Sequence, residues 1–398
     1  MALGITVSCA VWGTVLAGLL SAIPGERYGA RNCLRFAAAL YFIAAIGSAS
    51  SWSWASLLLF RFTGGIGLGC ALVFGPMYIA DIAPAKWRGR MVSSFQFSIV
   101  TGILLGYASN YIVGQLHPGV SEWRWQLGVA AAPALLFFLA LLSIPHSPAW
   151  LVKKGRIEEA RRALTQMRAE DCERKMVAIQ RSLESESRQK AQKLFTRRHR
   201  LPIFLAISVG FFNQFSGINA ILYYLNDIFA QAGFSRVSAN VQSIAIGAAN
   251  LLFTVLAMLL IDRMGRRFLL LVGSAGMAAC LAGVAAIFYM MHHQEILLWC
   301  LIGYIAFFAF SQGTVVWVYL SEVFPTSARV KGQSLGTFSL LLMNALVAAA
   351  FPRIAAASSG APFVFFSAMM VLQFFVVLFI FPETKGLSLE DVSQYIGS

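Results

Sequence analysis

A group of polar side chains lies inside one of the most apolar parts of the chain. Within segment 201–230 the polar residues include Asn213, Gln214, Ser216, Asn219, Tyr223, Tyr224, Asn226 and Asp227. Such groups are costly in hydrocarbon unless they face other protein or a water-filled cavity. Many hydrogen-bonding groups with little charge suit a neutral ligand that is rich in hydroxyls. The alternative is that they join helices by hydrogen bonds.

A helix through this segment does not present all of these groups together. Gln214 and Asn219 lie off the face that a regular helix forms from Asn213, Ser216, Tyr223 and Asp227. Gly217 offers a place for the helix to bend or unwind. We therefore expect a break at Gly217 that redirects the amides.

The composition predicts an all-α polytopic membrane protein. The 398 residues are 58% hydrophobic and 12% charged, and the mean hydropathy is +0.71. A span needs about 20 apolar residues. The predicted spans are roughly 3–23, 33–51, 55–80, 91–114, 126–144, 201–230, 240–261, 268–290, 296–320, 333–353 and 362–381.

The positive charge follows the predicted topology. Basic residues gather in alternate loops, above all in segment 153–200, although the net charge of +14 on its own would suggest a nucleic-acid partner. Cytoplasmic loops of membrane proteins are enriched in Lys and Arg. We therefore expect an external amino terminus, a cytoplasmic carboxyl terminus and contact with the bilayer surface, and no nucleic acid. The six cysteines have no metal-ligand spacing.

Three short motifs recur at a separation of about 240 residues. Segment 26–31 matches 262–267, segment 81–88 matches 322–329, and segment 145–148 matches 382–385. Recurrence at nearly one offset predicts two homologous bundles. The expected parts are a first bundle at 1–150, an amphipathic cytoplasmic linker at 151–200, a second bundle at 201–381 and a cytoplasmic tail at 382–398.

The repeated loops combine acids with arginines. Such pairs suggest a cytoplasmic gate closed by salt bridges between bundles, and the alternative is that the arginines only fix the topology. The residues concerned are Arg27, Arg31, Asp81, Arg88, Asp262, Arg266, Arg267, Glu322 and Arg329.

The motifs together resemble the sugar porter family of the major facilitator superfamily. The matching stretches are ERYGAR, RFTGGIGLG, PMYIADIAPAKWRGR, PHSPAWL, NQFSGINAILYY, DRMGRR, SEVFPTSARVKG and FPETKG. The resemblance implies a major facilitator fold with two pseudo-symmetric bundles that alternate access to a central sugar site.

The resemblance also implies roles for particular residues. Trp317 would pack against a sugar ring, and Tyr223 and Tyr224 would line the external gate, with Tyr223 also contacting substrate. The residues implied to bind sugar hydroxyls are Gln96, Asn213, Gln214, Asn219 and Asn250. The arginines and acids of the repeated loops would form the cytoplasmic charge network.

The sequence departs from the family pattern at several positions. His146 and Ala149 stand where the family has an acid and an arginine. His146 could titrate at this position, and the alternative is a surface histidine without a function. Leu340 and Leu341 replace a polar and an aromatic sugar contact. These changes leave the particular sugar open.

The family's first helix has no counterpart, so eleven spans are predicted instead of twelve. Arg61 lies within a span and has no acid near it in sequence, and a lone arginine in hydrocarbon is costly. In proton-coupled relatives the first helix carries the acid that pairs with this arginine. We expect an upstream segment to supply that helix and its acid.

We therefore predict a secondary transporter for a hexose, pentose or polyol, coupled to protons in its complete form. The alternative is a sugar sensor that does not transport, or an inactive truncated porter. An enzyme is not expected, because no catalytic constellation, metal site or cofactor motif is present. The glycines of segment 63–69 lie mid-span with no strand before them, which favours close helix packing over nucleotide binding.

Overall fold

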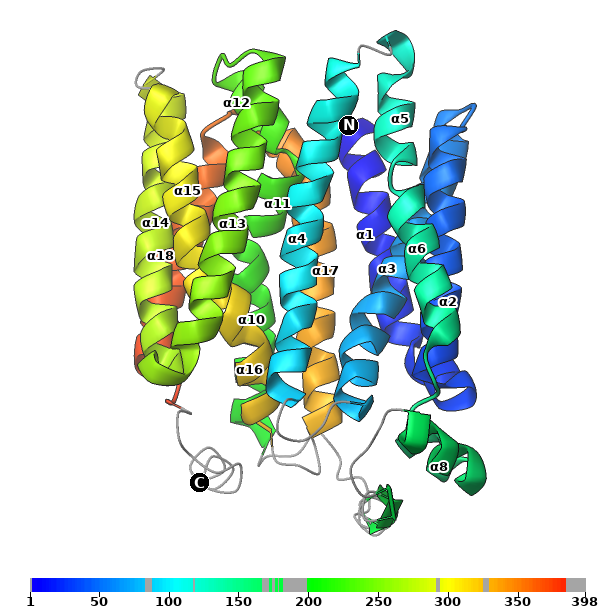
Figure 1. Ribbon diagram of the computed structural model, residues 1–398. Coiled ribbons are helices and arrows are strands. Elements are labelled where there is room, and N and C mark those ends of the chain that lie inside the picture. Colours follow the sequence, from blue (N-terminus) through cyan, green and yellow to red (C-terminus); the bar gives the residue numbers. More distant parts are fainter. Residues whose placement is uncertain are drawn as a thin grey trace. The chain divides into compact units, whose positions relative to one another are not determined.

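The computed structural model is built from helices (Figure 1). It describes residues 2–82, 88–116, 119–166, 172–173, 176–177, 179–181, 199–290, 294–324 and 329–383, and these contain no strand. Eleven helices within the described residues are long and apolar enough to cross a membrane, as predicted. The tail from 384 onward and most of 167–198 lie outside the described residues.

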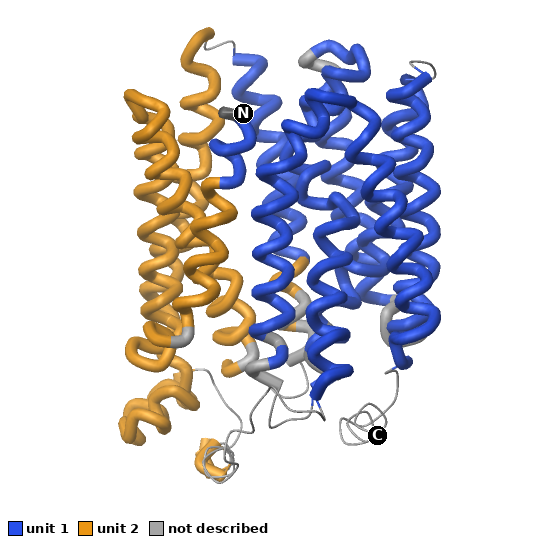
Figure 2. The backbone as a smooth tube through the Cα atoms, turned by 180° about the vertical axis from the view of Figure 1, so that it is seen from behind, with its two compact units in different colours: residues 1–8, 97–116, 193–398 blue, residues 9–96, 117–192 orange. Residues whose placement is uncertain are grey.

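The chain divides into two compact units (Figure 2). Unit 1 contains 1–8, 97–116 and 193–398, and unit 2 contains 9–96 and 117–192. Helices α1 and α4 contribute to both units. The finer division into bundles, linker and tail remains a prediction.

Unit 2 is built on α2 and α3, which pack along each other. Its glycines allow unusually close helix contact: a Cβ on Gly65 would lie 1.9 Å from the carbonyl oxygen of Ala10. This supports helix packing for segment 63–69. The helices in the first 166 residues, which include the two helices shared with unit 1, are α1 (Ala2–Leu20), α2 (Ala22–Ala49), α3 (Trp54–Ile82), α4 (Arg88–Gln115), η1 (Gly119–Ser121), α5 (Glu122–Gly128), α6 (Ala131–Ser143), α7 (Pro148–Lys153) and α8 (Ile157–Gln166).

The second span begins earlier than predicted. The sequence places residues 24–32 in a loop, whereas α2 runs from Ala22 and contains a single non-helical residue, Gly29, at φ 77°. Glycine adopts positive φ without steric cost. The polar segment therefore continues as a kinked helix.

Unit 1 has the larger core, formed where α14 packs against α15 and α18. Met277, Leu281, Tyr304 and Met370 are fully buried there. The helices are α10 (Arg200–Phe215), α11 (Ile218–Tyr223), α12 (Leu225–Gln231), α13 (Arg236–Met264), α14 (Arg266–Met290), η3 (Gln294–Ile296), α15 (Leu297–Phe308), the π-helix η4 (Ala309–Gly313), α16 (Thr314–Glu322), α17 (Arg329–Ala357) and α18 (Ala361–Ile380).

Candidate functional site

The predicted break in segment 201–230 is present at Gly217. Helix α10 ends at Phe215, and α11 begins at Ile218 after Gly217 takes φ 86°. A Cβ at this position would lie 2.3 Å from the ring of Phe366. Both the positive φ and the close ring restrict the position to glycine.

The break brings three amides into one hydrogen-bonded chain. Gln214 Nε2 donates to Asn213 Oδ1 at 2.9 Å, and Asn219 Nδ2 donates to Gln214 Oε1 at 2.9 Å. Gln214 is only 1% exposed. The bonds fix the direction of all three side chains, and each primary amide has further donor or acceptor capacity.

Neighbouring hydroxyls hold the backbone around this amide chain. Ser216 Oγ donates to the carbonyl oxygen of Asn213 at 2.6 Å, and the buried Tyr304 donates its hydroxyl to the carbonyl of Ser216 at 3.0 Å. These bonds satisfy carbonyls that the broken helix leaves without their usual partners. The amide chain is therefore pre-arranged.

A second polar contact joins α11 to α17. Asn344 Nδ2 donates to the hydroxyl of Tyr223 at 3.4 Å, and Tyr223 is 43% exposed. Asn344 Oδ1 is buried and has no hydrogen-bond partner. The sequence alone gave us no prediction for Asn344, although this amide lies one helical turn after Leu340, on the same face.

The two tyrosines predicted at the gate have different surroundings. Tyr224 is buried, stacks on Phe351 with ring centroids 5.2 Å apart, and donates its hydroxyl to Ala348 O at 3.0 Å. It also lines a pocket of about 430 Å³ together with Asp227. Tyr223 instead presents its side chain at an exposed surface.

The remaining predicted sugar contacts lie on other elements. Asn250 is buried on α13, and Trp317 is 43% exposed on α16. Gln96 is partly exposed and belongs to unit 2. Six of the seven predicted sugar contacts thus lie on α10, α11, α13 and α16 of unit 1, and Gln96 lies in unit 2.

The second copy of the repeated loop is held by a carboxylate. Glu383 accepts hydrogen bonds from the backbone N–H groups of Arg266 and Arg267, at 2.9 and 3.1 Å, where α14 begins. The Arg267 guanidinium donates to Leu378 O at 2.5 Å. An anion at a helix N-terminus is favourable, so Glu383 caps α14.

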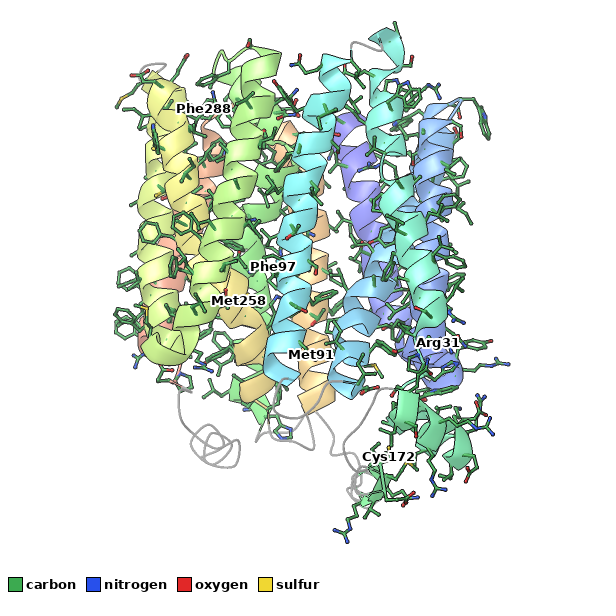
Figure 3. The ribbon with its side chains drawn as sticks, viewed as in Figure 1. Arg31, Met91, Phe97, Cys172, Met258 and Phe288 are labelled. Atoms are coloured by element: carbon green, nitrogen blue, oxygen red, sulfur yellow. The ribbon has the colours of Figure 1, made fainter. Side chains whose placement is uncertain are left out.

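The first copy has the same framework without the carboxylate. Arg31 donates to Leu142 O at 3.5 Å, as Arg267 does to Leu378 O. Figure 3 shows Arg31 toward the end of α2 that lies near α8. His146 stands in place of Glu383 and stacks on Trp150, with ring centroids 5.2 Å apart. The ring of Trp150 lies against Gly29.

Several charged side chains lie near His146. Burial and the nearby guanidinium groups of Arg31, Arg156 and Arg35 lower the pKa of His146, while Glu159 opposes them. These surroundings favour the neutral form of the imidazole. This environment differs from that of an ordinary exposed surface histidine.

The other predicted charge-network residues are described only in part. Asp81 accepts a hydrogen bond from Ser147 Oγ at 2.6 Å, and Arg27 is exposed, with its guanidinium 5.3 Å from the ring of Tyr28. Arg61 is partly buried within α3. The side chains outside the description are those of Arg88, Asp262, Glu322 and Arg329.

Comparison with known proteins identifies the family. The Sugar (and other) transporter family model matches residues 1–395. The chain belongs to this sugar transporter family. Its relatives include the D-xylose-proton symporter of Escherichia coli (strain K12), 33% identical over 98% of this chain and 85% of the relative. The arabinose-proton symporter of Bacillus subtilis (strain 168) is 34% identical over 98% of this chain and 86% of the relative.

Solved structures of one sugar transporter have the same fold. The inward-open structure of the xylose transporter XylE from E. coli matches with a TM-score of 0.87 and 31% identity, over 99% of this chain and 89% of XylE. XylE bound to 6-bromo-6-deoxy-D-glucose matches with a TM-score of 0.81 and 32% identity, over 99% and 89% of the two chains. The predicted major facilitator fold and the multi-pass membrane class are confirmed.

Proposed function

We propose that this sugar transporter moves a monosaccharide or a polyol across the membrane by alternating access, together with protons. The observation that carries the proposal is the buried amide chain of Asn213, Gln214 and Asn219 at the break between α10 and α11. The family membership, and relatives described as proton symporters for xylose and arabinose, support it.

The chemistry of the amide chain fits a neutral polyhydroxylated ligand. A sugar hydroxyl both donates and accepts, and a primary amide offers both functions in one plane. Because the three amides are oriented by each other, binding costs little side-chain entropy. Trp317, Tyr223 and Asn344 would add an apolar ring surface and further hydrogen bonds.

The apolar residues of α17 bear on the choice of sugar. Leu340 and Leu341 are both buried, and leucine has no hydrogen-bonding group with which to fix a hydroxyl. A site that lacks such a partner discriminates weakly between substrates with and without that hydroxyl. We infer that Asn344 supplies part of the polar contact from this helix.

The proposed cycle needs a gate and a proton carrier. The acids and arginines of the repeated loops would close the cytoplasmic side, and Arg61 would take part in proton coupling. The amino terminus would face outward and the carboxyl terminus the cytoplasm.

Uptake into proteoliposomes tests this function. We expect labelled xylose, arabinose, glucose or a polyol to accumulate when an inward proton gradient is imposed. Labelled amino acids and carboxylates, as charged controls, should not accumulate. Failure of every sugar and polyol to cross, in vesicles that contain folded protein, would overturn the proposal.

A further inference from the structure

The π-helix η4 sets the direction of the helix that carries Trp317. Residues from Leu297 to Glu322 form α15, η4 and α16 without a gap. A π-turn contains about one residue more than an α-turn, and each residue advances the helix by about 100°. All of α16 is therefore rotated by about 100° relative to an uninterrupted helix. The orientation of Trp317 depends on this wide turn.

Two side chains, one within the wide turn and one directly after it, satisfy nearby backbone carbonyls. Thr314 Oγ1 donates to the carbonyl of Ala309 at 2.9 Å, five residues earlier, and Ser311 Oγ donates to Phe307 O at 2.7 Å. A Cβ on Gly273 of α14 would lie 2.0 Å from Ser311 Oγ. The turn is thus packed closely against α14.

A buried amide pair links the same turn to α18. Gln312 Nε2 donates to Gln373 Oε1 at 2.6 Å, and Met370 Sδ lies 3.4 Å from the same nitrogen. The two glutamines are 1% and 4% exposed. Every other buried residue of α18 is apolar.

Joining two helices through this buried amide pair has a cost in free energy. Gln312 Oε1 is buried and has no hydrogen-bond partner, and an unsatisfied buried polar atom costs about 1–3 kcal/mol. Two well-packed apolar side chains would avoid that cost. The pair does, however, have a direction, because one specific nitrogen must meet one specific oxygen.

We propose that Gln312 and Gln373 are positioning residues for the sugar site. Their hydrogen bond holds η4 against α18, fixes the wide turn, and thereby directs the Trp317 indole toward the substrate. The inference rests on the proposed function, in which Trp317 packs against the sugar ring. It adds two buried residues that do not themselves touch the sugar.

Transport kinetics of Gln373→Leu test the proposal. Loss of one hydrogen bond, about 1 kcal/mol, should raise KM about fivefold, with the maximal rate per folded transporter nearly unchanged. Gln373→Met, which keeps an unbranched side chain that adapts to its surroundings, is the second variant if the leucine variant does not fold. Ser367→Ala is the matched control, because it removes another hydrogen bond from α18, to Ala278 O, and should leave KM unchanged.

A background lacking the indole separates positioning from general damage. In Trp317→Leu, the added Gln373→Leu change should raise KM no further. An equal rise in both backgrounds, or an unchanged KM in Gln373→Leu, would overturn the proposal. If wild-type protein moves no sugar, the proposed function itself fails. If wild-type protein transports but Trp317→Leu leaves KM unchanged, this positioning role alone fails.

Discussion

Replacement of Glu383 by alanine should destabilise unit 1 through the beginning of α14. The carboxylate accepts two backbone hydrogen bonds, from Arg266 and Arg267. A hydrogen bond to a charged group contributes about 1.5–3 kcal/mol, and loss of a helix N-cap costs about 0.5–2 kcal/mol. Because Glu383 is only partly buried, we expect a loss of about 2 kcal/mol, where the two ranges overlap.

Thermal unfolding of the detergent-solubilised protein measures this loss. For a unit of about 230 residues, about 2 kcal/mol corresponds to a fall of roughly 4–8 °C in the apparent Tm. Glu383→Gln retains one acceptor oxygen without the charge, so its Tm should lie between those of the wild type and Glu383→Ala. Glu173→Ala removes an exposed acid paired with Arg161, and should shift the Tm by about 2 °C or less. A Tm for Glu383→Ala equal to that of Glu173→Ala would refute the capping argument.

Three further outcomes follow from the described contacts. Gln214→Leu removes the centre of the amide chain and should raise KM for sugar at least about tenfold in vesicle uptake, since more than 1.4 kcal/mol of hydrogen bonding is lost; an unchanged KM would exclude Gln214 from the site. Gly217→Ala places an alanine at positive φ and its Cβ against Phe366, and should lower the apparent Tm or abolish folding. Wild-type stability of this variant would contradict the requirement for glycine at this position. The pKa of His146 is lower in the folded protein than its ordinary 6.5. Because the unfolded chain therefore binds more protons just below that pH, stability should fall as the pH drops below about 6.5. A plot of Tm against pH should fall less for His146→Phe than for the wild type, and an identical slope would contradict this role of His146.

The helical spans and the break at Gly217 could be predicted because each has a local cause. Long apolar segments predict membrane helices, and a glycine beside a row of amides predicts a bend. The pairing of Gln214 with Asn219 also follows once the helix is broken there. These features depend on residues that are close in sequence.

Other parts of the site depend on contacts between distant segments. Asn344 lies in an apolar run, and only the packing of α17 against α11 brings it to Tyr223. The wide turn at η4 has no proline or glycine signature before Gly313, and its partner Gln373 lies 61 residues away along the chain. The kinked helix at Gly29 was predicted as a loop because its charges resemble those of a loop.

Proton movement that depends on sugar tests the central claim most directly. Proteoliposomes without an imposed gradient would receive an inward xylose or arabinose gradient while the external pH is recorded in weak buffer. We expect the external solution to become alkaline as sugar and protons enter together, and Gln214→Leu to reduce this pH change at low sugar concentration. Sugar binding with no flux of either sugar or protons would contradict it.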